Sequence, residues 1–342
     1  DTLKDARLPI EKADAGKTRV FSAGPMHYTI VYRKYFLPFF AHCMQNRVDN
    51  SMAPGINPTS PEWHKLAAFL RTKGKHVIAG DYSNYDGKAC TEGYRACYEA
   101  AIFWYMQHWD EVVTQKRNVV QGVELDRKHF ASMLRNIALE SLTHIHLCEK
   151  QFEVNGELQR YRVFYQVMNG MPSGNPGTAI TNSVCGIWMF LYCWFDIFQS
   201  TDLDSADQFF QNVYMITYGD DVCANISDYV IDAFNQLTLT SAMKKNFDID
   251  FTDEAKTGDI VKSRTLDQIT FLKRRFKYND YLMQYVAPMP VDVLLDITNW
   301  VRTGAEDPTV VTINNLKGVL GELALDSEET FDEYYPKFIN VA

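Results

Sequence analysis

Two acidic groups lie where short β-rich segments of the sequence end. Asp81 follows the segment at 75–80, and Asp220-Asp221 stands between two further segments at 213–217 and 222–225. Side chains at the ends of neighbouring strands can converge, and converging carboxylates bind hard cations such as Mg²⁺. Two such ions activate an attacking hydroxyl and neutralise a leaving pyrophosphate, so the pattern favours phosphoryl transfer. The alternative for Asp220-Asp221 is a turn with two solvated carboxylates.

Two further segments have the composition of a phosphate or sugar site. A Gly- and Pro-rich loop at 169–177 leads into a long apolar stretch. Its backbone amides and the hydroxyls of Ser173 and Thr178 are suited to approach a ribose or phosphate, although a flexible connector has a similar composition. Near the N-terminus, Lys12, Lys17 and Arg19 are suited to bind a triphosphate, because Arg clamps phosphate oxygens in bidentate fashion.

The elements that must position these residues indicate an α+β core. Helical spacing predicts helices at 91–109, 124–142, 178–198 and 228–245, and further helices with loops after 286. Alternating patterns predict strands at 143–154 and 158–167 around Asn155-Gly156, a strong hairpin signal, and at 269–276 and 282–286. We expect three or four antiparallel strands with helices packed behind them.

Composition places the chain among folded, multi-subdomain proteins. Its 342 residues exceed what one core usually supports, with 46% hydrophobic and 23% charged residues. Seven cysteines without a C-x-x-C pair argue against a disulfide framework or structural zinc and predict reduced thiols. The apolar stretch at 185–198 is short for a bilayer and contains Asp196, which predicts a buried helix rather than an intrinsic transmembrane segment. The start lacks Met, which suggests a fragment or a product cut from a polyprotein.

Net charge alone argues against a nucleic-acid partner, but its distribution does not. The formal charge is −9, whereas phosphate affinity comes largely from Lys and Arg. Basic residues gather before residue 35 and at 273–277, while acidic residues accumulate after 290. These clusters are compatible with an RNA-binding surface or with ordinary solvated surface.

The motifs occur in an order that resembles the viral RNA-dependent RNA polymerases of the picornavirus-like group. In chain order they are Lys12-Ala-Asp-Ala-Gly-Lys17-Thr-Arg19, Gly80-Asp81-Tyr-Ser-Asn-Tyr-Asp86-Gly, Met171-Pro-Ser173-Gly174 through Thr178 to Asn182, Tyr218-Gly-Asp220-Asp221 and Phe271-Leu-Lys273-Arg274-Arg275-Phe276. The resemblance runs from about residue 4 to about residue 290. The wording of the second motif suggests a dicistrovirus-like or iflavirus-like lineage.

The resemblance implies a right-hand polymerase with an antiparallel-sheet palm backed by helices, partial fingers and a helical thumb. Its expected divisions are a fingers segment with the basic triphosphate-binding motif (1–38), the first part of the palm (39–100), a fingers insertion (101–168), the second part of the palm with the Gly-Asp-Asp hairpin and primer grip (169–277), and an incomplete thumb (278–342). By the same resemblance, we expect the upstream fingers to be missing from the sequence, and the stretch between Asp86 and Ser173 is longer than expected for picornaviruses.

The same resemblance assigns roles to individual residues. Asp81 and Asp220 are expected to bind the catalytic Mg²⁺ ions, or Mn²⁺ in their place, with Asp221 assisting as a further ligand. Lys256, or Lys262 in a different alignment, is expected to protonate the pyrophosphate. The incoming nucleotide is expected to contact Lys12, Lys17, Arg19, Asp86, Ser173, Gly174, Thr178 and Asn182. Of these, Asp86, Ser173, Thr178 and Asn182 are expected to read the ribose 2′-hydroxyl, whereas Lys273 and Arg274 are expected to contact primer RNA.

The implied function is RNA-templated RNA synthesis from NTPs in viral genome replication. RNA template and primer are the implied partners, a protein primer and other viral replication proteins remain open, and the implied location is host cytoplasm at membrane-associated replication complexes. A reverse transcriptase is disfavoured, since Asp86 and Asn182 stand where it carries a bulky residue. A catalytically silent polymerase fold that binds RNA or serves in assembly is the rival from another class.

Overall fold

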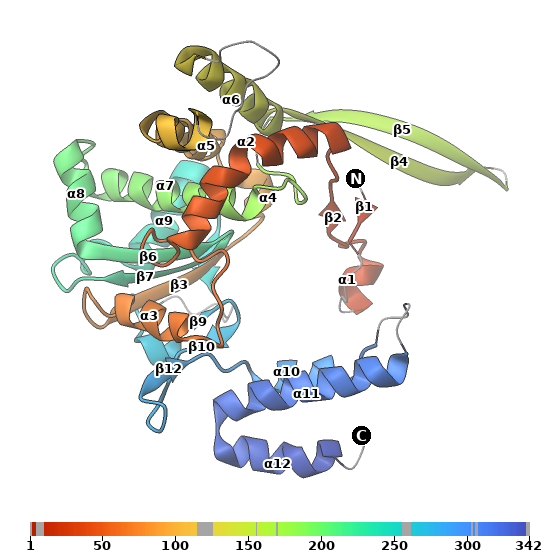
Figure 1. Ribbon diagram of the computed structural model, residues 1–342, viewed down its shortest axis with the longest axis vertical. Coiled ribbons are helices and arrows are strands. Elements are labelled where there is room, and N and C mark those ends of the chain that lie inside the picture. The colour runs from red at the N-terminus through yellow and green to blue at the C-terminus, as the bar shows by residue number, and fades with distance from the viewer. Residues whose placement is uncertain are drawn as a thin grey trace.

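The computed structural model describes residues 2–4, 10–114, 126–154, 156–168, 170–254, 261–301, 304 and 307–339. A four-stranded antiparallel sheet, here called the central sheet, lies at its centre in the strand order β6-β7-β3-β8 (Figure 1). Its strands are β3 (His76–Tyr82), β6 (Val213–Tyr218), β7 (Asp221–Ile226) and β8 (Phe251–Asp253). The prediction of three or four antiparallel strands is confirmed.

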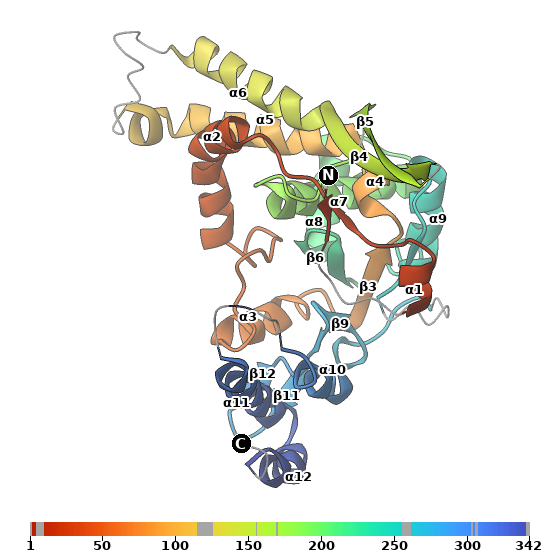
Figure 2. The same cartoon turned by 90° about the vertical axis from the view of Figure 1, so that its right-hand side faces the viewer.

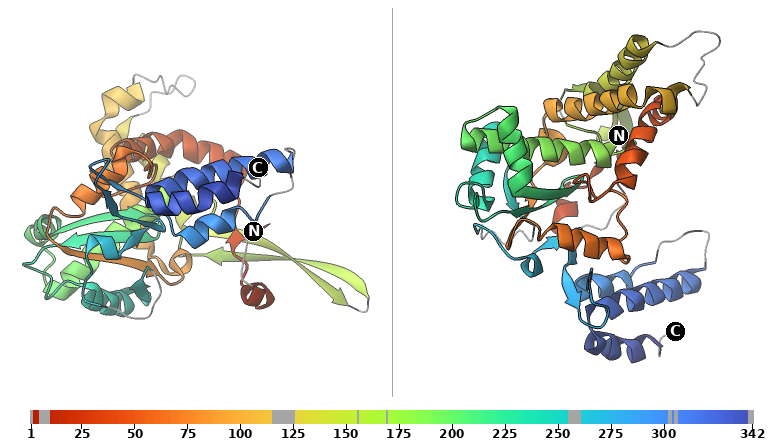
Figure 3. Two further views of the ribbon diagram at one scale, coloured as in Figure 1. Left: turned by 90° about the horizontal axis from the view of Figure 1, so that it is seen from below. Right: turned by 60° about the vertical axis from the view of Figure 1, so that its left-hand side comes forward.

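Both faces of the central sheet are buried, because successive side chains along a strand point to opposite faces. Ile78 joins a large core with α2 (Met26–Gln45), α5 (Thr91–Gln107), α7 (Thr178–Phe198) and α9 (Gln236–Phe247). Its neighbours Val77 and Ala79 join a second core with α3 (Pro61–Phe69). The strands therefore read as continuous apolar runs. Helices α5 and α7 lie side by side over the first face (Figure 3).

A long hairpin projects from this body (Figure 1). It consists of β4 (His144–Val154) and β5 (Glu157–Val167), which follow α6 (Arg127–Leu142) and pair with each other only, among the described strands. Every described side chain of β5 except Val167 is exposed. Three further elements belong to the body of the molecule: α4 (Tyr85–Lys88), the π-helical turn η1 (Trp109–Thr114) and α8 (Leu203–Asn212).

The N-terminal segment forms β1 (Thr2–Leu3), α1 (Ile10–Asp14) and β2 (Val20–Phe21). The C-terminal part contains η2 (Leu266–Gln268), β9 (Thr270–Phe271), β10 (Arg274–Arg275), β11 (Lys277–Asn279), β12 (Gln284–Val286), α10 (Val291–Ile297), α11 (Pro308–Asp326) and α12 (Glu328–Ile339). Helices α10 to α12 lie together below the central sheet (Figure 2). They share a small separate core around Leu294, Val319 and Leu323.

Four elements depart from the sequence prediction. The single strand predicted at 269–276 is the antiparallel pair β9 and β10, because the residues between them form a turn. The helix predicted at 228–245 begins only at Gln236, because Asn235 caps it with a reciprocal capping box and the residues before it form turns. Strand β3 continues through Asp81 to Tyr82 instead of ending before it. Strand β8 was not predicted, since three residues are too few to show a periodic pattern.

Helix α7 has the predicted bounds and the predicted role in the core. By length and composition it is apolar enough to cross a bilayer, and 56% of its most apolar stretch is buried inside the protein. Its buried side chains pack toward α5, α9 and β6. All seven cysteines are described and carry free thiols.

Candidate active site

The register of the central sheet brings the two acidic groups to one edge. Gly80 pairs with Val222 across β3 and β7, and Tyr218 pairs with Asp221 where the β6–β7 hairpin closes. One residue beyond Gly80, Asp81 therefore lies beside the Asp220-Asp221 turn. Gly80 is required here, because a Cβ atom would lie 2.0 Å from Cζ of Phe251. The turn itself uses Gly219 in the left-handed region, with φ of 64°.

The electrostatics of this edge tie the carboxylates together. Burial raises the pKa of Asp221 to about 6, with further contributions from the charges of Asp220 and Asp81 and a smaller opposing one from Lys273. The pKa of Asp220 is also raised, first by burial and then by the charges of Asp86 and Asp81, against an opposing backbone hydrogen bond and the charge of Arg19. Burial and repulsion between carboxylates thus disfavour the ionised forms, and the positive charges of Arg19 and Lys273 offset this only in part.

A divalent cation fits this charge deficit, since its charge and oxygen preference match the carboxylates of Asp81, Asp220 and Asp221. Across the part of the chain that the structure describes, no three His, Cys, Asp or Glu side chains are close enough together to form a ready-made metal site. The described residues thus bring suitable ligand types to one edge of the sheet without forming a preformed cluster of three ligands.

The basic N-terminal segment reaches the same edge. Arg19 is close enough to Asp220 for its charge to lower the pKa of that carboxylate. Strand β2 is held there by a hydrogen bond from the backbone N–H of Ser22 to the carbonyl of Ser173, at 2.8 Å. Lys12 and Lys17 are exposed on the same segment. Of the three predicted triphosphate ligands, Arg19 is thus the one whose charge reaches the acidic turn.

The Gly-rich loop packs against α4 and the N-terminal segment. Ser173 donates to Oδ2 of Asp86 at 3.2 Å, as expected for two members of one network. Gly170 and Gly174 both have positive φ. A Cβ atom on Gly170 would lie 1.9 Å from the carbonyl oxygen of Asp86, and one on Gly174 would lie 2.4 Å from that of Ser22. Thr178 instead donates within the loop, to the carbonyls of Asn175 (2.7 Å) and Pro172 (3.2 Å).

Asn182 lies in α7 directly behind this loop. Its side chain is 4% exposed, and its Oδ1 is buried without a hydrogen-bond partner. Its backbone carbonyl accepts from the Tyr85 hydroxyl at 2.8 Å, which ties α7 to α4. Within the described residues Asp86 pairs with Ser173 rather than with Asn182. A buried acceptor left open in this way marks a place where a donor such as a hydroxyl fits.

The predicted primer residues divide between two roles. Lys273, at φ of 60°, is close enough for its charge to lower the pKa of Asp221. Arg274 makes a bidentate pair with Glu322 of α11, at 2.7 and 2.8 Å, and donates to the carbonyl of Ala287. Its guanidinium therefore joins β10 to the C-terminal helices.

The predicted general acid Lys256 lies outside the described residues. Its alternative, Lys262, forms an ion pair with the exposed carboxylate of Asp232. That pairing takes Lys262 toward α9 and its preceding turns, and it gives no support to the alternative alignment.

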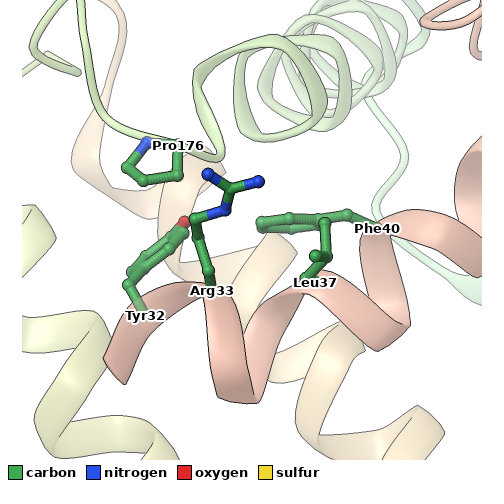
Figure 4. Close-up of a pocket in the computed structure, with 5 residues that line it drawn as sticks. All are labelled: Tyr32, Arg33, Leu37, Phe40 and Pro176. Atoms are coloured by element: carbon green, nitrogen blue, oxygen red, sulfur yellow. The ribbon is translucent and has the colours of Figure 1, made fainter. Parts of the chain in front are cut away.

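Sequence reasoning missed Ser183, which follows Asn182. Its hydroxyl accepts the backbone N–H of Gly219 at 2.9 Å, so α7 fixes the acidic turn directly. The signal was its position one residue after a predicted ribose contact. A cavity of about 280 Å³ also lies beside the loop, lined by Tyr32, Arg33, Leu37, Phe40 and Pro176 (Figure 4). None of the predicted site residues lines it.

Comparisons with known proteins agree with this geometry. Residues 1–341 match the family model described as viral RNA-dependent RNA polymerase. The chain is 37% identical over 338 residues to the replicase polyprotein of cricket paralysis virus, covering 97% of this chain and 18% of that polyprotein. It is 32% identical over 344 residues to the genome polyprotein of deformed wing virus, covering 100% of this chain and 11% of that one.

These relatives confirm the suggested dicistrovirus-like or iflavirus-like lineage. The chain spans less than a fifth of the length of either polyprotein. A solved structure, the Sicinivirus 3Dpol RNA-dependent RNA polymerase, matches with a TM-score of 0.71 at 17% identity, over 98% of this chain and 61% of that one. This likeness confirms the predicted α+β polymerase fold. The chain therefore belongs to the viral RNA-dependent RNA polymerase family.

Proposed function

We propose that this chain carries out RNA-templated RNA synthesis, transferring a nucleotide from an NTP to the 3′-hydroxyl of RNA during viral genome replication. The observation that carries the proposal is the shared edge of β3 and the β6–β7 hairpin, where Asp81, Asp220 and Asp221 interact electrostatically. Family membership supports the reaction type.

The carboxylates of Asp81 and Asp220 would hold two Mg²⁺ ions, or Mn²⁺, with Asp221 as a further ligand. When bound, the ions activate the 3′-hydroxyl and neutralise the charge of the leaving pyrophosphate. The raised pKa values of Asp220 and Asp221 would fall on metal binding, because the cation favours the ionised carboxylates. These residues therefore form a site that is poised for a cation.

The chain's own side chains orient the nucleotide. Arg19, with Lys17 and Lys12 on the same segment, would bind the triphosphate beside Asp220. Asp86, Ser173 and Asn182 would receive the ribose, with the open Oδ1 of Asn182 accepting a hydrogen bond from a ribose hydroxyl. Gly174 and Thr178 give the loop its shape. Lys273, whose charge lowers the pKa of Asp221, would contact primer RNA. Lys256 remains the proposed acid for pyrophosphate.

The partners of the reaction follow as proposals. RNA template, RNA primer and NTPs are its substrates, with a protein primer and other replication proteins as further partners. The segments that match this chain are parts of longer viral polyproteins, which agrees with assembly among other viral products. Host cytoplasm, at membrane-associated replication complexes, is the proposed location, and the division into palm, fingers and thumb at the predicted boundaries is likewise proposed.

Primer extension tests the function. The purified protein, an annealed RNA primer–template and NTPs should give extended product with Mg²⁺ and none with EDTA. Asp220→Asn should lower kcat by about 10³-fold or more, since a neutral amide loses the charge that holds the cation. Asp232→Asn is the matched control, because Asp232 is exposed and paired with Lys262. A wild-type protein that binds RNA without extending it would overturn the proposal in favour of an RNA-binding module.

A further inference from the structure

A buried serine connects two helices, α6 and α2, to the Gly-rich loop. Ser141, in the last turn of α6, is 2% exposed. Its hydroxyl accepts from Nδ2 of Asn175 at 2.9 Å and shares a hydrogen bond with the hydroxyl of Tyr28 from α2. The Tyr28 hydroxyl also lies 3.3 Å from the carbonyl of Ile137. We call Ser141, Tyr28 and Asn175 the Ser141 junction.

The junction holds one end of the loop whose other end meets the ribose network. Asn175 uses its Oδ1 to accept the backbone N–H of Gly177 at 2.9 Å, so its side chain is bonded at both ends. Two residues earlier, Ser173 donates to Asp86. Between them, Gly174 is confined by the carbonyl of Ser22. We therefore expect a shift of Asn175 to move Ser173 as well.

The geometry points to a positioning role: we propose that the Ser141 junction fixes the 170–178 loop so that Ser173 and Asp86 select the ribose of the incoming nucleotide. This inference rests on the proposed function and assigns part of its sugar selectivity to α6 and α2, whose junction side chains do not touch the nucleotide. Ser141 and Tyr28 are therefore positioning residues.

Hydrogen-bond accounting supports the assignment. A serine hydroxyl donates once and accepts up to twice, and Asn175 fills one acceptor position of Ser141. Burial raises the pKa of Tyr28 to about 12, so its hydroxyl keeps its proton and remains a donor. Removing the Ser141 hydroxyl leaves the Asn175 amide without its partner in a poorly solvated place, which favours a shifted loop.

The test measures kcat/KM for an NTP and for the matching dNTP in primer extension. Ser141→Ala should narrow the NTP preference by roughly fivefold, the size expected from losing one or two net hydrogen bonds. Tyr28→Phe should narrow it less, since the Asn175–Ser141 bond survives. Ser205→Ala is the matched control, because it also removes a buried serine hydroxyl, one that accepts from Nε1 of Trp194. Ser205 lies in α8, an element away from the Gly-rich loop (Figure 1).

A double-mutant cycle separates positioning from general destabilisation. If the junction acts through the loop, Ser141→Ala should change the sugar preference little in a Ser173→Ala background, so that the two effects are not additive. An unchanged NTP to dNTP ratio in Ser141→Ala, or full additivity with Ser173→Ala, would overturn the inference while the wild type still extends RNA. Absence of extension by the wild type would instead reject the proposed function on which it rests.

Discussion

The central sheet and the long hairpin are both antiparallel and well registered, yet they differ in what surrounds them. The strands of β4 and β5 pair along eleven residues each, whereas the longest strand of the central sheet, β3, has seven. Nearly every described position of β5 is exposed, while β6 and β7 are buried along almost their entire length. Strand length therefore does not determine which region forms the rigid base of the site.

Burial explains the difference. Two core clusters sandwich the central sheet, and each buried aliphatic side chain contributes about 1.5–3 kcal/mol relative to exposure. The long hairpin has backbone hydrogen bonds and cross-strand pairs but exposes Ile145, Leu158 and Phe164. An isolated two-stranded hairpin is only marginally stable in water. The acidic turn thus lies on the more extensively buried of the two regions.

The largest expected effect comes from truncating one apolar side chain in each region. Ile216 in β6 is fully buried, and Ile216→Ala should lower the free energy of unfolding by about 2–5 kcal/mol through lost burial and a cavity. Phe164→Ala in β5 should change it by less than about 0.5 kcal/mol, because that ring is mostly exposed. Urea denaturation of both variants measures the difference. Equal losses would mean that the hairpin shares a core with the sheet.

Breaking an ion pair should lower the free energy of unfolding more beside the central sheet than in the long hairpin. Glu254, which follows β8, accepts from Arg264 and from the backbone N–H of Thr270, and both charged side chains are largely buried. Glu254→Gln should cost about 3 kcal/mol, because it leaves the Arg264 charge poorly compensated. In the hairpin, Glu149 lies 3.7 Å from Arg160 and from Arg162 at exposed positions. Glu149→Gln should cost at most about 0.5 kcal/mol, and a similar loss for both variants in urea would refute the contrast.

The smallest effect is a pH dependence at the acidic turn. The pKa of Asp221 is about 6 in the folded protein, against an unfolded value of about 3.9. Its contribution to stability is therefore fully present below pH 4 and is lost as the pH rises through 6. The loss should be about 1–2 kcal/mol in metal-free buffer, after discounting for partial exposure.

Asp221→Asn should remove that part of the pH dependence, since an amide does not titrate. The measurement compares the free energy of unfolding at pH 4 and pH 7 for both proteins, with and without Mg²⁺. Added Mg²⁺ should recover stability at pH 7 in the wild type more than in the variant. An unchanged difference between pH 4 and pH 7 in Asp221→Asn would show that burial and repulsion at this turn do not raise the pKa of Asp221.

The sequence predicted the parts of the molecule whose signals are local. Helix α7 was correct at both ends because a Gly-rich loop precedes it and its apolar run is long. The β6–β7 hairpin followed from strands on both sides of Gly219. The partner of Arg274 was not predictable, since Glu322 lies 48 residues away on a helix whose position depends on tertiary packing. Likewise, the sequence could not predict that Asp86 bonds to Ser173 and not to Asn182, because this depends on how α4 packs against α7.

The contacts of α7 bear on which parts of the site can move together. Its residues 182 and 183 bond to Tyr85 of α4 and to Gly219 of the acidic turn, while its N-terminus continues from the Gly-rich loop. A single helix thus links three motifs that are far apart in the sequence. We therefore expect a displacement of this helix to move all three motifs together, which would couple the proposed ribose contacts to the proposed metal ligands.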